Sequence, residues 1–259
     1  MNEIKIPFAL PDKITGLVRD AKIYDSSCSP EARVYYVNKD LGYFLKVSAK
    51  GSLSNEAKMT DYFYKKGIGP KVIEYVSCDR DFLITGQVHG ENATHARFLS
   101  NPKKLCDTFA QHLRALHETD FSDCPIKNRN ESYLALADEN YAKGQFDLSL
   151  TAELFPFGSA DEAYKILNDG KSALKCDTLL HGDYCLPNII LKNDFEFSGF
   201  IDLGNAGVGD RHIDIFWGTW TLFFNLKTDK YRSRFLDAYG RDKIDEDMMK
   251  IIAAAEVFG

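Results

Sequence analysis

The chain has 259 residues, of which 44% are hydrophobic and 27% charged, and its formal net charge is −6. This composition is typical of a globular protein whose core is large enough for two lobes, and it excludes a low-complexity chain. The acidic balance argues against a nucleic-acid partner, because phosphate backbones attract basic proteins, and it suits a polycationic small-molecule substrate.

The sequence has no apolar run as long as a membrane span, and its start lacks the basic-then-apolar layout of a signal peptide. Its six cysteines are scattered without a C-x-x-C pair, which indicates reduced thiols rather than disulfides or zinc ligands. We therefore expect a cytoplasmic protein without a membrane partner, present as a monomer or a weak dimer.

Residues 1–88 have the pattern of a small β-rich lobe with one helix. The predicted strands are 34–37, 43–47 and 82–85. A polar stretch at 38–42 joins the first two strands as a hairpin. Ser54 is a suitable N-cap for a helix that continues to a stop at Gly67.

One lysine in this lobe stands out, because Lys46 lies inside an apolar strand, where an unpaired ammonium group is costly to bury. A lone strand lysine usually extends to the surface. Here the next helix offers Glu56, which repeats the kinase arrangement of a strand lysine paired with a helix glutamate. We therefore predict that Lys46 binds the α- and β-phosphates of a nucleotide and that Glu56 holds it in place.

From residue 89 the pattern becomes helical, and Gly86–Gly90 is the expected boundary. An amphipathic stripe predicts a helix ending near His117, Ser159 begins a capping box, and residues 212–226 are apolar enough for a buried helix. The sequence thus predicts an α+β fold of two lobes, the first β-rich and the second mostly helical. The expected lobes are residues 1–88 and 89–259.

The segments HGDYCLPN at 181–188 and IDLG at 201–204 place an acid, an amide and a second acid beside short apolar runs. The kinase signatures H-R-D-x-x-x-x-N and D-F-G have the same order of functional groups. Either segment alone could be a capped turn or a strand end. Together they predict phosphoryl transfer from ATP, with Asp183 accepting the proton of the acceptor hydroxyl and Asn188 and Asp202 holding Mg²⁺.

With the upstream LRALHETDFSDCP and the ending AEVFG, these motifs resemble the bacterial aminoglycoside 3'-phosphotransferases over nearly the whole chain. The resemblance implies a bilobal protein-kinase-like fold that uses ATP and Mg²⁺. It further implies phosphorylation of an aminoglycoside, at the 3'-hydroxyl, as a means of antibiotic resistance. It also implies that Asp214 supports the catalytic loop, while Asp210 is expected to pair with Arg211 or a helix end.

The resemblance also assigns the nucleotide site. No G-x-G-x-x-G loop is present, and residues 26–32 occupy its place with the family's Ser-Pro version of the turn. The family pattern places the Ser29 hydroxyl on phosphate oxygens and stacks Phe44 on adenine. Gly86 and Val88 would offer backbone groups to the adenine edge.

For the acceptor, the family pattern implies carboxylates, because aminoglycosides carry several ammonium groups. The implied residues are Asp147 and Glu153 in an insertion, and Glu256 with Phe258 at the C-terminal end. The alternative for Asp147 and Glu153 is ordinary solvated surface.

Departures from the family pattern keep other acceptors open. Asn205 stands where the family usually has arginine, and further departures occur at Trp220, Phe224, Asn225 and Ala255. A kinase of a macrolide, choline or a sugar-like metabolite would share every ATP residue. A non-catalytic nucleotide-binding protein of the same fold is the alternative of a different class. A protein kinase is disfavoured because an A-P-E segment is missing.

Overall fold

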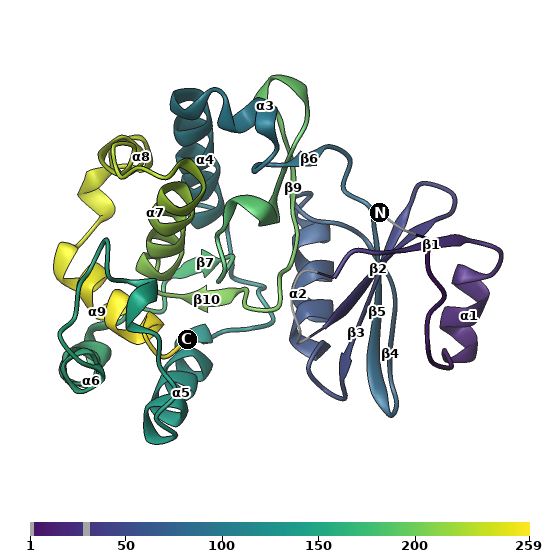
Figure 1. Cartoon of the computed structure of the whole chain (residues 1–259), viewed down its shortest axis with the longest axis horizontal. Coiled ribbons are helices and arrows are strands. Elements are labelled where there is room, and N and C mark those ends of the chain that lie inside the picture. The colour runs from purple at the N-terminus through teal and green to yellow at the C-terminus, as the bar shows by residue number, and fades with distance from the viewer. Residues whose placement is uncertain (1–2, 28–31) are drawn as a thin grey trace.

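The structure is a computed structural model that describes residues 3–27 and 32–259. Ser29, predicted to contact phosphate, lies outside the described residues. Figure 1 shows a β-rich part formed by the first third of the chain and a larger, mainly helical part formed by the rest. Strand β5 ends at Gly86 and the helical part begins with β6 at Glu91. The division into lobes at residue 88 stays a prediction.

The β-rich part is one antiparallel sheet with the strand order β1-β2-β3-β5-β4. Its elements are α1 Asp12–Val18, β1 Lys22–Asp25, β2 Arg33–Asn38, β3 Tyr43–Ala49, α2 Ser54–Lys65, β4 Val72–Ser77 and β5 Arg80–Gly86. Side chains alternate along β5, so Phe82 and Ile84 pack with α1 while Leu83 packs with α2. The two helices therefore cover opposite faces of the sheet (Figure 1).

Helix α2 connects the two parts of the molecule. Its residues Met59, Tyr62 and Phe63 belong to the large core of the helical part. The predicted N-cap is wrong, because the helix begins at Ser54 itself, and Leu53 precedes it without a side-chain cap. The backbone N–H of Leu53 instead bonds the Asp81 carboxylate at 2.9 Å, which anchors the start of the helix to β5.

The helical part contains six helices of eight or more residues among the described elements and two small sheets. These six are α4 Pro102–His117, α5 Arg129–Ala142, α6 Ala160–Gly170, α7 His212–Leu226, α8 Arg232–Tyr239 and α9 Glu246–Glu256, and the shorter α3 Ala96–Leu99 precedes them. The strands are β6 Glu91–Asn92, β7 Thr178–Leu180, β8 Ile189–Leu191, β9 Phe197–Phe200 and β10 Gly207–Gly209. Five short 3₁₀ turns are Leu148–Leu150, Lys171–Ala173, Leu186–Asn188, Asn193–Phe195 and Arg241–Lys243.

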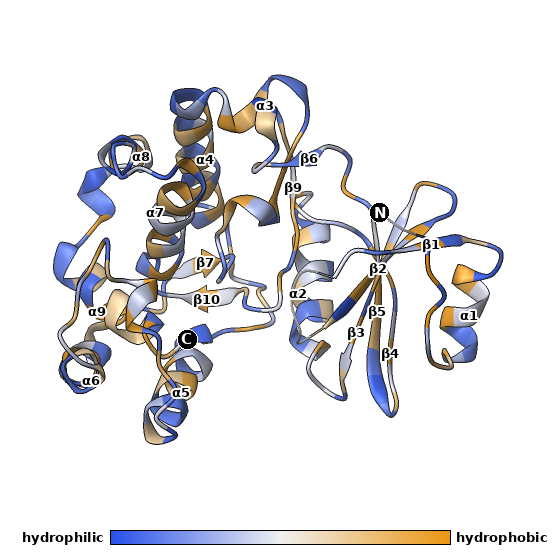
Figure 2. Cartoon of the chain, in the orientation of Figure 1, coloured by the Kyte–Doolittle hydropathy of each residue, from blue (hydrophilic) through white to orange (hydrophobic). Residues whose placement is uncertain are grey.

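Two antiparallel pairings, β7 with β10 and β8 with β9, hold the polar loops between them in fixed positions. Helix α7 has the bounds predicted from its apolar sequence and lies in the core, where Figure 2 shows apolar residues along it and along α4. None of the helices in the described part of the chain is long and apolar enough to cross a membrane.

Candidate active site

The loop 181–188 joins β7 to β8, and a glycine shapes it. Gly182 has a φ of +81°, a conformation that side-chain-bearing residues rarely adopt. A Cβ atom added there would lie 1.9 Å from the backbone oxygen of Asn205. Only glycine therefore lets the loop that carries Asp183 approach the loop that follows Asp202.

Within this loop Asp183 and Asn188 are joined directly. The Asn188 side-chain Nδ2 donates to the Asp183 backbone oxygen at 3.0 Å and to its carboxylate Oδ2 at 2.9 Å. His181 Nδ1 accepts from the Asp183 N–H, at 3.3 Å, and His181 Nε2 lies 3.0 Å from the Ile201 carbonyl. Because a carbonyl can only accept, His181 carries its proton on Nε2 and ties the loop to the end of β9.

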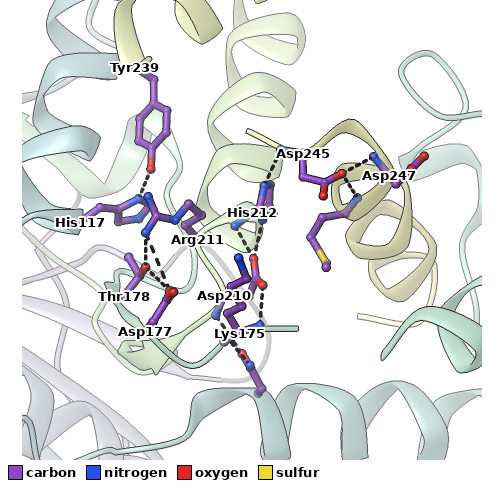
Figure 3. Close-up of polar contacts among 12 residues, drawn as sticks. His117, Lys175, Asp177, Thr178, Asp210, Arg211, His212, Tyr239, Asp245 and Asp247 are labelled. Atoms are coloured by element: carbon purple, nitrogen blue, oxygen red, sulfur yellow. Dashed lines mark hydrogen bonds and ion pairs between the residues drawn. The ribbon is translucent and has the colours of Figure 1, made fainter. Parts of the chain in front are cut away.

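Asp214, at the start of α7, supports the loop 181–188 through hydrogen bonds to its backbone. Its carboxylate accepts from the backbone N–H groups of His181 and Gly182, each at 2.8 Å, as predicted for a supporting residue. His117 Nε2 lies 3.1 Å from the same carboxylate. On the other side of the ring, the Tyr239 hydroxyl lies 2.8 Å from His117 Nδ1, a contact drawn in Figure 3. Burial lowers the pKa of His117, so the ring is neutral. Its two hydrogen bonds connect Tyr239 to Asp214 and thereby to the loop.

Asp210 has a structural role that was only half predicted. Of the two expected alternatives, the pairing with Arg211 is not formed, because the Arg211 guanidinium bonds Thr178 at 3.1 Å and lies 3.8 Å from Asp177 (Figure 3). The expected helix end is right. Asp210 accepts from the backbone N–H of His212 at 3.0 Å and from its ring Nδ1 at 2.6 Å, which caps α7.

A second cluster faces the loop from the sheet. Lys46 Nζ on β3 lies 2.8 Å from Glu56 Oε2 on α2 and 2.8 Å from Asp202 Oδ1 after β9. Burial acts to lower the pKa of Lys46, but the carboxylates of Asp202 and Glu56 outweigh it, and the net pKa is raised. Burial raises the pKa of Glu56. The lysine thus joins the β-rich part to the loop 201–204.

The oxygen atoms at this junction fit Mg²⁺. Asn188 turns its amide nitrogen to Asp183, which leaves its Oδ1 as a ligand atom, and the Ile201 N–H bonds the Asn188 carbonyl at 3.0 Å. Asp202 adds a carboxylate whose side chain is 50% exposed. No group of three His, Cys, Asp or Glu residues suited to a metal occurs within the described ranges. An amide and one carboxylate suit a magnesium ion that is also held by phosphates.

The predicted nucleotide contacts are brought to one end of the sheet. Phe44 is half-buried, with its ring 5.3 Å from that of Tyr36. The role of Gly86 stays a prediction, and its N–H donates to the Lys71 carbonyl at 2.9 Å, so this N–H is not free for a ligand. Val88 is half-buried, and neither backbone group of this residue meets a partner in residues 3–27 and 32–259.

The predicted acceptor residues divide into surface and core. Asp147 and Glu153 are exposed, and Asp147 accepts from the Ser149 N–H at 2.8 Å, which caps a 3₁₀ turn. The Asp147 N–H bonds the Val257 carbonyl at 2.8 Å, so the insertion lies beside the C-terminal end. The Phe258 ring is buried and packs edge-on against Tyr141 and Tyr164, and it cannot contact a ligand without moving.

Glu256 is the buried carboxylate of the acceptor side, 3% exposed. It accepts from the Tyr133 hydroxyl at 2.9 Å and from the Trp217 ring N–H at 3.0 Å. The pKa of Glu256 is raised to about 7, chiefly by burial, against the lowering effect of these two donors and of Arg129, and the negative charge of Asp183 contributes to the rise. The charge of Asp183 in the loop 181–188 therefore affects the pKa of Glu256.

Comparison with known proteins agrees with this geometry. The family model described as the phosphotransferase enzyme family matches residues 30–251. The chain belongs to this phosphotransferase family. It is 50% identical over 250 residues to a probable aminoglycoside 3'-phosphotransferase from Lactococcus lactis, covering 96% of this chain and 95% of the relative. It is 32% identical to an aminoglycoside 3'-phosphotransferase from Niallia circulans, covering 69% of this chain and 67% of the relative.

The fold is shared with solved structures. The aminoglycoside phosphotransferase APH(3'')-Id from Streptomyces rimosus, in complex with ADP and streptomycin, superposes with a TM-score of 0.71 at 22% identity. The match covers 87% of this chain and 90% of that structure. The predicted bilobal, kinase-like α+β fold is confirmed.

Sequence reasoning missed several residues of the phosphotransferase site. Tyr133 and Trp217 are donors to Glu256, and Arg129 bonds the loop after Asp202. The one available signal was the spacing of Arg129 and Tyr133, which stand four residues apart and so share a face of α5. Their partners are 76 and 123 residues away in the chain, and no local pattern points to them.

We expect Glu256 to make the stability of this phosphotransferase pH-dependent. Its folded pKa of about 7 exceeds the ordinary 4.5, so the folded state binds the proton more tightly than the unfolded chain. Stability from this group is therefore fully present below an ordinary glutamate pKa and is lost as the pH rises through about 7. Glu256→Gln cannot ionise, so it does not lose this stability as the pH rises. The Tm of Glu256→Gln minus the Tm of wild type should therefore increase by roughly 3 °C from pH 6 to pH 8.

Thermal melts at several pH values measure this difference. Glu153→Gln, on an exposed carboxylate, is the matched control and should follow wild type. A Tm difference for Glu256→Gln that is constant from pH 6 to pH 8 would show that Glu256 does not titrate in this range.

Proposed function

We propose that this phosphotransferase transfers the γ-phosphoryl group of ATP, with Mg²⁺, to the 3'-hydroxyl of an aminoglycoside antibiotic. The observation that carries the proposal is the joined pair Asp183 and Asn188, with the cluster of Lys46, Glu56 and Asp202 beside it. These residue types, in this order, are those of phosphoryl transfer in kinases. The named relatives and the solved complex with ADP and streptomycin support the same donor and substrate class.

In the proposed mechanism Asp183 orients the acceptor hydroxyl and accepts its proton. Asn188 Oδ1 and the Asp202 carboxylate would hold Mg²⁺, which neutralises charge on the phosphates when bound. Lys46, kept in place by Glu56, would neutralise the α- and β-phosphates. Most of the rate would come from positioning and electrostatics.

On the nucleotide side we propose that Phe44 stacks on adenine and that Val88 offers its free backbone groups to the adenine edge. Gly86 can contribute only its carbonyl, since its N–H is already bonded. A lobe boundary near residues 86–90 would then lie against the nucleotide. Because ATP is the donor, we place the enzyme in the cytoplasm, as a monomer or a weak dimer.

On the acceptor side we propose that Glu256, with Asp147 and Glu153 at the surface, attracts the ammonium groups of the substrate. A cation favours the ionised carboxylate, so substrate binding would draw the Glu256 proton off at neutral pH. Phe258 would act indirectly, by holding the C-terminal end in the core.

A second candidate is a kinase of a less cationic alcohol, and one observation favours it. On α7 the rings of Trp220 and Phe224 stack at 4.9 Å with an angle of 10°, and Phe224 is 49% exposed. The exposed ring of Phe224 offers apolar area for the flat face of an acceptor, and Lys227 Nζ already lies 4.1 Å from the ring centroid.

The deciding experiment is magnesium-dependent ADP release from ATP with a panel of aminoglycosides and with macrolide, choline and sugar acceptors. We expect turnover with compounds that have a 3'-hydroxyl and none with their 3'-deoxy analogues. Turnover limited to the other alcohols would replace aminoglycosides by the second candidate. ATP binding without turnover on any acceptor would favour the non-catalytic alternative.

A further inference from the structure

An arginine of α5 is hydrogen-bonded to the loop that follows Asp202. Arg129 Nε donates to the backbone oxygen of Asn205 at 2.9 Å, and its NH2 group donates to the Asn205 side-chain Oδ1, also at 2.9 Å. A third bond, from NH1 to the Ser132 hydroxyl at 2.7 Å, fixes the guanidinium on its own helix. The planar guanidinium thus holds both oxygens of Asn205 at once, a geometry that lysine cannot reproduce.

Asn205 lies where the loop that follows Asp202 contacts the loop that carries Asp183. Asn205 follows Asp202 by three positions, in a loop without helix or strand. Its backbone oxygen occupies the space that a side chain at Gly182 would need, next to Asp183. Asp202 itself has a φ of +60°, a conformation that costs an aspartate energy unless its surroundings hold it. The same oxygen that packs on the catalytic loop is therefore the one that Arg129 bonds.

This arrangement is not explained by ordinary ion pairing. Among the described residues no carboxylate lies within 4.0 Å of the Arg129 guanidinium, and burial lowers its pKa. Arg129 is half-buried, and removing part of a cation from water without a direct anionic partner costs free energy, which the more distant charges of Glu256 and Asp214 offset only in part. If Arg129 served only to stabilise the N-terminus of α5, this free-energy cost would be unnecessary. The neighbouring 126–130 segment is already fixed to β10 by the bond of Ile126 to Val208, and to the residue after β10 by the bond of Asn130 to Asp210.

We propose that Arg129 and Asn205 form a positioning pair that holds the Asp202 loop against the catalytic loop, so that Asp202 and Asp183 keep their relative places. The inference rests on the proposed roles of these two aspartates. Arg129 is a positioning residue, because it acts through Asn205 and contacts neither aspartate. Its loss loosens the junction at which Mg²⁺ would be held, while the Lys46–Glu56 pair that would bind phosphates is untouched.

The test is nucleotide binding, measured by calorimetry as the affinity for ADP with and without Mg²⁺. Arg129→Ala should weaken the affinity for ADP in the presence of Mg²⁺ by roughly 10-fold and leave the metal-free affinity unchanged. Arg129→Lys should behave like Arg129→Ala, because it keeps the charge but not the fork. Asn205→Asp keeps both acceptor oxygens and should behave like wild type. Arg241→Ala, which removes an exposed arginine, is the matched control.

A double-mutant cycle separates positioning from general stability. If the pair acts as a unit, Arg129→Ala combined with Asn205→Ala should lose no more magnesium-dependent affinity than Arg129→Ala alone, because Asn205→Ala removes only the side-chain acceptor of the same guanidinium. Additive losses would overturn the proposal. So would an Arg129→Ala protein with a lower Tm but an unchanged effect of Mg²⁺ on ADP affinity. If Arg129→Ala does not fold, Asn205→Ala alone carries the comparison, since it removes one acceptor and leaves α5 intact.

These measurements use no acceptor. Absence of turnover with aminoglycosides would therefore overturn the proposed substrate and leave the positioning pair standing. An effect of Mg²⁺ on ADP affinity that is the same in every variant would overturn the pair, whatever the substrate.

Discussion

Asp183→Asn should lower kcat by about 10²- to 10⁴-fold, the range that a positioned general base contributes. Asparagine has nearly the same shape, and its amide oxygen can still accept the Asn188 Nδ2 bond that Asp183 Oδ2 accepts at 2.9 Å. The loop is also held by Asp214 through the N–H groups of His181 and Gly182, which the change does not touch. The loss should therefore fall on the chemical step and not on folding.

Steady-state kinetics at saturating ATP and acceptor measure kcat, and calorimetry measures the affinity for ADP with Mg²⁺. We expect the ADP affinity of Asp183→Asn to stay within about twofold of wild type, because the proposed nucleotide contacts come from other residues. Asp242→Asn, at an exposed aspartate paired with Lys243, is the control and should retain full activity. A kcat for Asp183→Asn within tenfold of wild type would mean that Asp183 is not the base.

The catalytic loop could be predicted from sequence because its information is local. Asp183 and Asn188 are five residues apart and bond each other, so their spacing alone encodes the geometry. Asp202 follows a short strand that pairs directly with the strand after Asn188. The buried helix α7 was equally readable, since its apolar sequence leaves no polar face.

The supporting contacts could not be predicted, because they join residues far apart in the chain. Lys46 and Asp202 are separated by 156 residues, and the sequence indicated only the pairing of Lys46 with Glu56. Asp210 has an arginine as its neighbour, and that adjacency suggested an ion pair. In the fold Arg211 turns to Thr178, because the first N–H of α7 needs a cap and the Asp210 carboxylate supplies it.

The two helices of the β-rich part were also incompletely predicted. The sequence of α1, DKITGLV, contains β-branched residues and a glycine that favour other conformations, and its packing on the sheet stabilises the helix instead. The N-cap predicted at Ser54 failed for a related reason. Asp81 from β5 satisfies the start of α2 through the Leu53 N–H, a tertiary contact that replaces the local serine cap.

Asp202→Asn should lower kcat by roughly 10³-fold, because a metal ion contributes several kcal/mol to phosphoryl transfer and each ~1.4 kcal/mol is a factor of ten. The reason is charge. Asparagine keeps an oxygen but loses the carboxylate that the proposed Mg²⁺ site needs. The structure adds a second expectation, since Lys46 Nζ now divides its contacts between Glu56 and Asp202, each at 2.8 Å. Without the Asp202 charge the lysine is free for phosphate, so metal-free ADP binding should not weaken.

Lys46→Met is the contrasting variant. It removes the cation that would meet the phosphates and leaves the carboxylate of Asp202 in place, so metal-free ADP binding should weaken while Mg²⁺ still strengthens it. It also leaves Glu56 buried without its partner, with a pKa that burial already raises. Calorimetry with ADP, with and without Mg²⁺, distinguishes the two variants. If Mg²⁺ strengthens ADP binding to Asp202→Asn as much as to wild type, Asp202 is not a magnesium ligand, and its contact with Lys46 would then be a structural link between the sheet and the catalytic part.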